Sequence, residues 1–307
     1  MIESALGSAV ALTLSPLDAL ARQLAQSAPL IERAIPSSGE KIPIIGIGTA
    51  RRYDVATAPE ARAPLAEVLK RFPEMGGKVL DTAPSYGAAE SVIGDITSEL
   101  GNRSKLFLAT KVAMRGGGSD LSAATRQMED SMRRLHTDRI DLMQVHNLGN
   151  VELLLPLLRE WKAAKRIRYI GVTTGSENQH DALVRYMETQ PMDFIQVNYS
   201  VDSRSAATRV LPLAADKGIA VLIDLPFGRT TVFQKVNGKP LPDWAAEIDC
   251  ATWAQVFLKY IVSTPGVTCA IPGTAKVEYL VDNLGAARGR MPDAAMRKKI
   301  EAFFDGQ

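Results

Sequence analysis

Apolar runs and amphipathic segments alternate along most of this chain, and that alternation limits its fold more than any other feature. Eight runs of near-continuous apolar residues are each followed by a segment whose apolar residues recur at helical spacing. Strands buried on both faces that alternate with helices are typical of a parallel sheet covered by helices. We expect strands at residues 44–49, 79–81, 106–110, 140–145, 167–173, 194–197, 219–224 and 268–271, and helices at residues 64–71, 90–100, 121–135, 151–164, 178–189, 205–217, 251–263 and 276–287.

Eight strand–helix units fit one closed barrel, a fold that typically takes about 250 residues. Residues 35–43 form two short extended pieces around a Ser-Gly turn, which predicts a hairpin closing the bottom of the barrel. The amphipathic segment 293–304 predicts one more helix after the eighth unit. The expected fold is therefore a (β/α)8 TIM barrel over residues 31–307, with an N-terminal hairpin and an extra C-terminal helix.

Residues 1–30 differ in composition from the barrel and form an N-terminal extension. A small apolar run ends before Pro16, and Ala19-Leu20-Ala21 has the A-x-A spacing of a signal-peptidase site. The positive charges that should precede such a run are missing, so an amphipathic helix packed on the barrel stays an alternative. We favour a remnant of an export leader. The chain is accordingly expected in the cytoplasm or, if the leader is real, in the periplasm.

Charge and cysteine content exclude several classes of function. The 36 basic and 34 acidic residues nearly balance, and no dense basic run with interleaved aromatic residues occurs, so nucleic-acid and membrane partners are not expected. Cys250 and Cys269 are expected to be small core residues, and no Cys/His cluster has the spacing of a metal site. His136 and His180 are expected at the surface. We expect a monomer.

Four reactive side chains stand at or just after the ends of three successive predicted strands: Asp81, Tyr86, Lys111 and His146. The carboxyl ends of parallel strands meet at one face of a barrel, so these side chains should lie close together. One such residue alone would more often be a solvated bystander. Four together indicate an active site.

The segments around these residues resemble the aldo-keto reductases. DTAPSYGAAESVIG at residues 81–94, ATK at residues 109–111 and VHN at residues 145–147 have the order and spacing of that family. The resemblance runs from about residue 42 to residue 304. It implies a (β/α)8 barrel that reduces an aldehyde or ketone, a small-molecule carbonyl substrate, with NADPH; NADH is possible as well.

The resemblance also implies a role for each of the four side chains. Tyr86 is the acid that protonates the carbonyl oxygen as a hydride reaches the carbonyl carbon. A free tyrosine has a pKa near 10 and burial would raise it, so a nearby cation is needed to lower it. Lys111 would supply that charge, held in place by Asp81, and His146 would orient the carbonyl oxygen.

The other strand ends would hold the cofactor. Thr173 and Thr174 stand where the family binds the nicotinamide carboxamide. Residues 273–276 begin a predicted helix, where backbone N–H groups favour a phosphate, and Lys276 would contact the adenosine 2′-phosphate. The expected cofactor-binding residues are Gly48, Thr49, Thr173, Thr174, Gln196, Tyr199, Pro226, Gly228, Arg229, Gly273, Thr274, Lys276, Asp282 and Asn283.

Two departures from the family pattern affect the cofactor. Tyr279 stands where an arginine often grips the 2′-phosphate, and tyrosine cannot pair with that charge, which weakens the expected preference for NADPH over NADH. Asp224 stands where many members carry a tyrosine that stacks on the nicotinamide. Tyr199 is a candidate for that aromatic platform instead.

Two other functions stay open. A cofactor-binding regulatory subunit of the same fold would turn over slowly, although the presence of all four catalytic-type residues argues against it. A different barrel enzyme could use Lys111 as a Schiff-base nucleophile, and the motif at residues 273–276 would then bind a phosphorylated substrate.

Three loops are expected to shape the substrate pocket: residues 51–59, 115–120 and 225–249. The last has 25 residues, far above the usual 2–6 of a strand-to-helix connection. It carries Phe227, Phe233 and Trp244, and Asn237-Gly238 predicts a hairpin turn in its middle. We expect a flap that orders over the cofactor.

Overall fold

The computed structural model describes residues 29–114 and 120–307. The expected leader remnant and most of the expected substrate loop at residues 115–120 lie outside the described residues.

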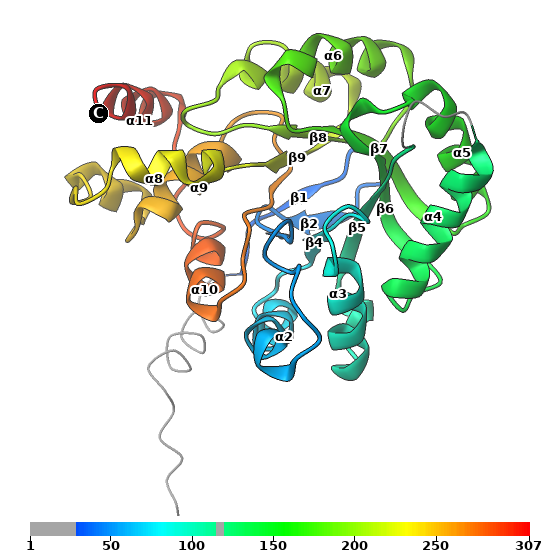
Figure 1. The fold of residues 1–307 in the computed structure, drawn as a ribbon. Coiled ribbons are helices and arrows are strands. Elements are labelled where there is room, and N and C mark those ends of the chain that lie inside the picture. The colour runs from blue at the N-terminus through cyan, green and yellow to red at the C-terminus, as the bar shows by residue number, and fades with distance from the viewer. Residues whose placement is uncertain (1–28, 115–119) are drawn as a thin grey trace, which may run out of the picture.

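Eight parallel strands form one sheet that closes into a barrel (Figure 1). Backbone bridges from Ile45 to Ala270 and from Gly48 to Gly273 join the first strand to the last. The strands are β3 (Ile47–Gly48), β4 (Val79–Asp81), β5 (Phe107–Val112), β6 (Ile140–Val145), β7 (Ile167–Thr174), β8 (Phe194–Asn198), β9 (Ala220–Asp224) and β10 (Cys269–Ala270). The predicted (β/α)8 barrel is therefore confirmed.

The predicted hairpin is present and closes the amino-terminal end of the barrel. Its strands β1 (Glu32–Ala34) and β2 (Lys41–Pro43) pair antiparallel. Ile35 and Ile42 are fully buried and join the apolar cluster that fills the barrel interior. Because side chains fill the interior of the barrel, it is a packed core and no channel runs through it.

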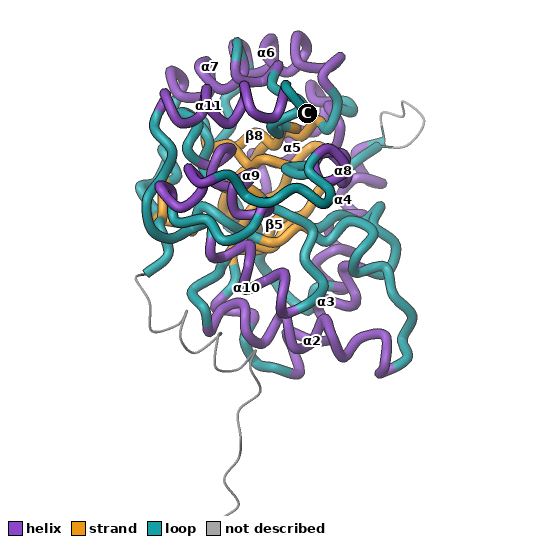
Figure 2. The backbone as a smooth tube through the Cα atoms, turned by 90° about the vertical axis from the view of Figure 1, so that its left-hand side faces the viewer, coloured by secondary structure: helices purple, strands orange, loops and turns teal. Residues whose placement is uncertain are grey.

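Amphipathic helices surround the strands, as Figure 2 shows from the side. The helix α2 begins at Pro59, five residues before the predicted start, because Pro59 as well as Pro64 suits a first helical turn and the helix continues through Pro64. The helices are α2 (Pro59–Glu74), α3 (Ala89–Glu99), α4 (Leu121–Arg134), α5 (Val151–Ala163), α6 (His180–Thr189), α7 (Val210–Lys217), α8 (Thr231–Lys235), α9 (Trp253–Val262), α10 (Val277–Gly285) and α11 (Ala294–Asp305). None of the described helices is long and apolar enough to cross a membrane.

The inward-facing side chains change from apolar to polar toward the carboxyl ends of the strands. Successive side chains of a strand point to opposite faces, so residues two apart share the barrel interior. Val79 belongs to the interior cluster, and Asp81 follows it on the same face at the cavity. In three other strands an apolar interior residue is likewise followed, two residues later, by a polar residue at the cavity: Ala109 by Lys111, Phe194 by Gln196 and Leu222 by Asp224.

The long connection at residues 225–249 folds differently from the prediction. It contains short helical turns at Gly228–Thr230 and Asp243–Ile248 on either side of α8, and no hairpin. Asn237-Gly238 does form a turn, but apolar side chains pull the flanking segments onto neighbouring helices. Phe233 packs edge-on against Phe257 of α9 with ring centroids 5.7 Å apart.

Candidate active site

A cavity of about 540 Å³ opens at the carboxyl ends of the strands. All four strand-end residues named above line it: Asp81, Tyr86, Lys111 and His146. They come from β4, from the turn after it, from β5 and from the helical turn after β6. A volume of this size is within the range of about 300–1,000 Å³ that small-molecule sites occupy.

Lys111 and Asp81 form an ion pair within this cavity. Lys111 Nζ donates to both carboxylate oxygens of Asp81, at 2.9 and 2.8 Å, and to the carbonyl oxygen of Thr82 at 2.8 Å. All three ammonium hydrogens are therefore held. Burial alone would lower the pKa of Lys111, but the carboxylate charge of Asp81 and the hydrogen bond to it raise this pKa, so the lysine stays protonated.

Tyr86 and His146 lie beside this pair. Lys111 Nζ is 5.0 Å from the centroid of the Tyr86 ring, and the rings of Tyr86 and His146 meet edge-on with centroids 6.1 Å apart. Burial raises the pKa of Tyr86, and the charge of Lys111 opposes this without overcoming it. Lys111 therefore acts on this pKa in the expected downward direction, but burial is the larger effect and the net shift is upward.

His146 is a neutral imidazole at neutral pH. Burial, with the charge of Lys111 added, lowers its pKa to about 4. The backbone after it is strained: Asn147, Leu148 and Asn150 all have positive φ. Residues other than glycine rarely adopt that conformation, and such strain is concentrated at functional sites. The backbone N–H of Asn147 donates to Thr173 Oγ1 at 3.0 Å, which ties this turn to β7.

Sequence reasoning missed a chain of two glutamines across the barrel. Gln144 Nε2 donates to Gln196 Oε1 at 3.1 Å and to Asp81 Oδ1 at 3.4 Å. Gln196 Nε2 donates to Asp224 Oδ2 at 3.4 Å. The signal was present in the sequence, because Gln144 follows the inward-facing Leu142 by two residues in an otherwise apolar strand.

Seven of the fourteen expected cofactor-binding residues line the cavity. Arg229 extends from the turn after β9, while the others lie at the strand ends or directly after them. The seven are Gly48, Thr49, Thr173, Gln196, Pro226, Arg229 and Gly273. Gly228 stands next to them at a positive φ of 52°, in a turn where an added Cβ would lie 2.3 Å from Thr231 Oγ1.

Tyr199 and Thr174 do not reach the cavity. Tyr199 is 2% exposed, its hydroxyl donates to that of Tyr260 at 3.0 Å, and the two rings stack with centroids 5.9 Å apart. The aromatic platform expected from Tyr199 is therefore not formed by this ring. Thr174 donates to Gln179 Oε1 at 2.6 Å, away from the cavity.

Three residues near α10 are held by contacts within the protein. Thr274 is fully buried, donates to the carbonyl oxygen of Pro272 and accepts from Asn283 Nδ2 at 3.0 Å. Asp282 accepts at 2.8 Å from Oγ1 of Thr252, the N-cap residue of the neighbouring helix α9. The hydroxyl of Thr274 and the side chains of Asp282 and Asn283 thus have structural contacts, which their positions in the sequence did not reveal.

Lys276 lies at the start of α10, and its side chain is 60% exposed. No side chain caps this helix, so its first backbone N–H groups are open to an anion. The ring of Tyr279 is exposed, with Lys276 Nζ 5.7 Å from its centroid.

The charge around the cavity suits a dinucleotide phosphate. Arg51 and Arg52 after β3 and Arg229 after β9 line it, and among the described residues their guanidinium groups form no hydrogen bond or ion pair. Arg52 packs over Gly273, since a Cβ added there would lie 3.6 Å from Arg52 Cγ. Unpaired guanidinium groups on two sides of one cavity favour a ligand with several negative charges.

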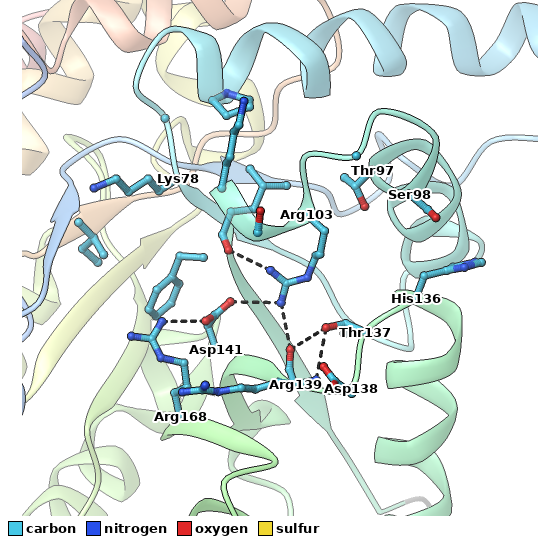
Figure 3. Close-up of a pocket in the computed structure, with 18 of the residues that line it drawn as sticks. Lys78, Thr97, Ser98, Arg103, His136, Thr137, Asp138, Arg139, Asp141 and Arg168 are labelled. Atoms are coloured by element: carbon cyan, nitrogen blue, oxygen red, sulfur yellow. Dashed lines mark hydrogen bonds and ion pairs between the residues drawn. The ribbon is translucent and has the colours of Figure 1, made fainter.

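A larger hollow of about 1280 Å³ lies at the opposite, amino-terminal end of the strands (Figure 3). Its central charges are already paired: Asp141 binds Arg103 on one side, at 3.3 Å, and Arg168 on the other, at 2.8 Å. Active sites of these barrels form at the carboxyl ends of the strands, where the unpaired guanidinium groups of Arg51, Arg52 and Arg229 also lie. The smaller cavity is therefore the candidate site.

Other titratable groups take structural positions. His180, expected at the surface, is buried, and its Nε2 lies 3.2 Å from Asn198 Oδ1, because α6 turns its first residue toward β8. His136 is half exposed beside Asp95. Cys250 and Cys269 are buried free thiols, as expected. Among the described residues, no cluster of His, Cys, Asp or Glu could hold a metal ion.

Comparison with known proteins identifies relatives of this chain. The pattern of the Aldo/keto reductase family matches residues 44–302. The chain is 30% identical to aldo-keto reductase YhdN of Bacillus subtilis over 201 residues, covering 62% of this chain and 60% of YhdN. It is 24% identical to aldo-keto reductase yakc [NADP(+)] of Schizosaccharomyces pombe over 306 residues, covering 86% of this chain and 89% of that protein.

The barrel also matches solved structures. An aldo/keto reductase from Klebsiella pneumoniae in complex with NADP and acetate superimposes with a TM-score of 0.72. The two chains are 24% identical, and the match covers 87% of this chain and 93% of that one. This likeness shows the fold.

Proposed function

The chain belongs to the aldo/keto reductase family, and we propose that it reduces an aldehyde or ketone to an alcohol with NADPH at the cavity formed by Asp81, Tyr86, Lys111 and His146. The observation that carries this proposal is the meeting of those four side chains in one cavity. NADPH, when bound, supplies the hydride that reaches the carbonyl carbon, and the π electrons of the carbonyl move to its oxygen.

Tyr86 gives the proton that this oxygen takes up. Its raised pKa keeps the phenol protonated at neutral pH, as an acid must be before the reaction. The fixed positive charge of Lys111 then stabilises the phenolate that remains. Neutral His146 retains an N–H that can donate to the carbonyl oxygen.

The unpaired guanidinium groups of Arg51, Arg52 and Arg229 would hold the phosphates of the cofactor. Lys276 and the open start of α10 would hold its 2′-phosphate. NADP appears in the name of the Schizosaccharomyces pombe relative and in that of the Klebsiella pneumoniae structure, which supports NADPH as the reductant.

The Schiff-base alternative has little support. A lysine nucleophile must be a neutral amine with a free lone pair. Lys111 has its three hydrogens held by Asp81 and Thr82, and its pKa is raised. A regulatory subunit would keep the same cofactor contacts, so turnover is the measurement that separates it from a reductase.

The test is the variant Tyr86→Phe with a good aldehyde substrate and NADPH. We expect turnover to fall about 100-fold or more, the scale of lost acid catalysis, while cofactor affinity stays nearly intact. Tyr186→Phe, which removes a hydroxyl bonded to Glu152 away from the cavity, is the matched control. Unchanged turnover in Tyr86→Phe would contradict the assignment, and no carbonyl reduction by the wild type would favour the regulatory subunit.

A further inference from the structure

Asp224 lines the cavity and has no ion-pair partner among the described residues. Three carboxylates line the cavity: Asp54, Asp81 and Asp224. Asp81 is paired with Lys111, and Asp54 accepts the backbone N–H of Ala88 at 2.9 Å and is exposed to solvent. Asp224 accepts one long hydrogen bond, from Gln196 at 3.4 Å, and its Oδ1 is closed off from solvent with no hydrogen-bond partner among the described residues.

Charged side chains from several strands and loops act on the carboxyl group of Asp224. Lys111 on β5 and Arg229 after β9 stabilise its negative charge, whereas Asp81 on β4 opposes it. Arg51, Arg52 and neutral His146 face the same cavity from other loops. Burial outweighs the two cations and raises the pKa of Asp224 to about 7. Near neutral pH the side chain therefore exchanges between a carboxylic acid and a carboxylate.

Hydride transfer creates positive charge in the cavity that Asp224 lines. Because the carbonyl oxygen must contact Tyr86, the hydride donor has to sit in the same cavity, and Asp224 already acts electrostatically on Tyr86. The nicotinamide ring is neutral in NADPH and carries one positive charge in NADP⁺. The rest of the two cofactors is the same, including the 2′-phosphate.

We propose that Asp224 sets the preference of this cavity for the oxidised, cationic nicotinamide over the reduced, neutral one. The inference rests on the proposed function, since it requires the nicotinamide cofactor in this cavity. Asp224 stands where many members of the family carry a tyrosine that stacks on the nicotinamide. In this chain the carboxylate would hold the charged nicotinamide by electrostatic attraction instead of ring stacking. The same attraction stabilises the charge that develops on the cofactor as the hydride moves to the carbonyl carbon.

The linkage between cofactor binding and proton release determines how the cofactor preference changes with pH. A cation beside a carboxylate lowers its pKa, typically by about one unit or more, so NADP⁺ binding near pH 7 releases protons from Asp224. NADPH binding lacks this contribution. For a shift of one unit, the preference for NADP⁺ over NADPH should rise about fivefold between pH 6 and pH 8.5.

Calorimetric titration of the wild type with NADP⁺ and with NADPH, in buffers of different ionisation enthalpy, measures the protons released. We expect more release with NADP⁺, with the difference largest near pH 6.5 for a shift of about one unit, and lost in Asp224→Asn. Protons from the 2′-phosphate cancel because both cofactors carry it. Asp54→Asn, which removes a solvated carboxylate from the same cavity, should retain the difference.

The outcomes separate the proposed role of Asp224 from the proposed reductase function. Equal proton release for both cofactors in the wild type, or a difference that persists in Asp224→Asn, overturns the role of Asp224 and leaves the proposed reductase intact. Failure of both cofactors to bind the wild type overturns the proposed function itself. The pH profile of the wild type requires no variant, so it tests the inference even if Asp224→Asn does not fold.

Discussion

Lys111 Nζ lies 2.8 Å from Asp81 Oδ2, with the lysine side chain 1% exposed and the aspartate side chain 3% exposed. Neither charge reaches water, so each depends on the other for compensation. This ion pair stands at the boundary between the apolar interior of the barrel and the cavity, where it fixes the charge beside Tyr86.

Removing one member of this pair should destabilise the fold. Asp81→Asn leaves a buried lysine without its counter-charge, and we expect the free energy of unfolding to fall by about 3–5 kcal/mol. Urea denaturation followed by circular dichroism measures this change. The control is Glu32→Gln, which breaks the exposed pair with Lys78 and should cost no more than about 1 kcal/mol. A similar loss in both variants would contradict the buried-pair argument.

The double variant Asp81→Asn/Lys111→Met separates stability from catalysis. With both charges gone, much of the lost stability should return, because neither member of the pair is left buried without its partner. Carbonyl reduction should stay low in the double variant, since Lys111→Met removes the cation that stabilises the phenolate of Tyr86.

His146 should make the stability of the protein depend on pH. Its pKa is about 4 in the folded chain and about 6.5 in an unfolded one, so the unfolded state binds the extra proton between these values. Stability is therefore lost as pH falls from about 6.5 toward 4. Between pH 7 and pH 4.5 we expect the wild type to lose about 2 kcal/mol more than His146→Asn. Equal losses in urea denaturation would refute this.

Lys276 should favour NADPH over NADH. Its ammonium group is largely exposed at the open start of α10, so its contact with a 2′-phosphate should be worth about 1 kcal/mol, or about fivefold in affinity. Lys276→Ala should weaken NADPH by this factor in a fluorescence titration and leave NADH unchanged. Lys298→Ala on the exposed face of α11 is the control. Equal affinity for both cofactors in the wild type would reject the role of Lys276.

The loop at residues 225–249 should respond to the cofactor only in its first part. Residues 225–227 and 229–230 line the cavity, whereas Trp244 packs edge-on against Phe303 of α11 with centroids 5.9 Å apart. On NADPH binding we expect added amide-exchange protection within residues 225–231 and little change at residues 236–249. No added protection anywhere in the loop would reject the flap, and protection confined to its second half would contradict the described packing.

The sequence alone was sufficient to place the four candidate catalytic residues at one face of the barrel. Each follows or ends an apolar strand, and parallel strands joined by helices must bring their carboxyl ends together. Local patterns also predicted the hairpin at the bottom and the C-terminal helix, expected at residues 293–304 and found as α11 (Ala294–Asp305). Both depend on turns and spacing that lie within a short segment.

The hydrogen-bond partners, burial and charge of individual side chains were decided by the tertiary structure. Tyr199 and Thr274 are polar residues next to strand ends, but Tyr260 and Asn283, 61 and 9 residues away, hold their hydroxyl groups. Whether Asp224 keeps its charge depends on burial and on Lys111, which is distant in sequence. Spacing along the chain fixes which face a side chain takes, whereas its partners and its exposure to water are set by segments that meet only when the barrel closes.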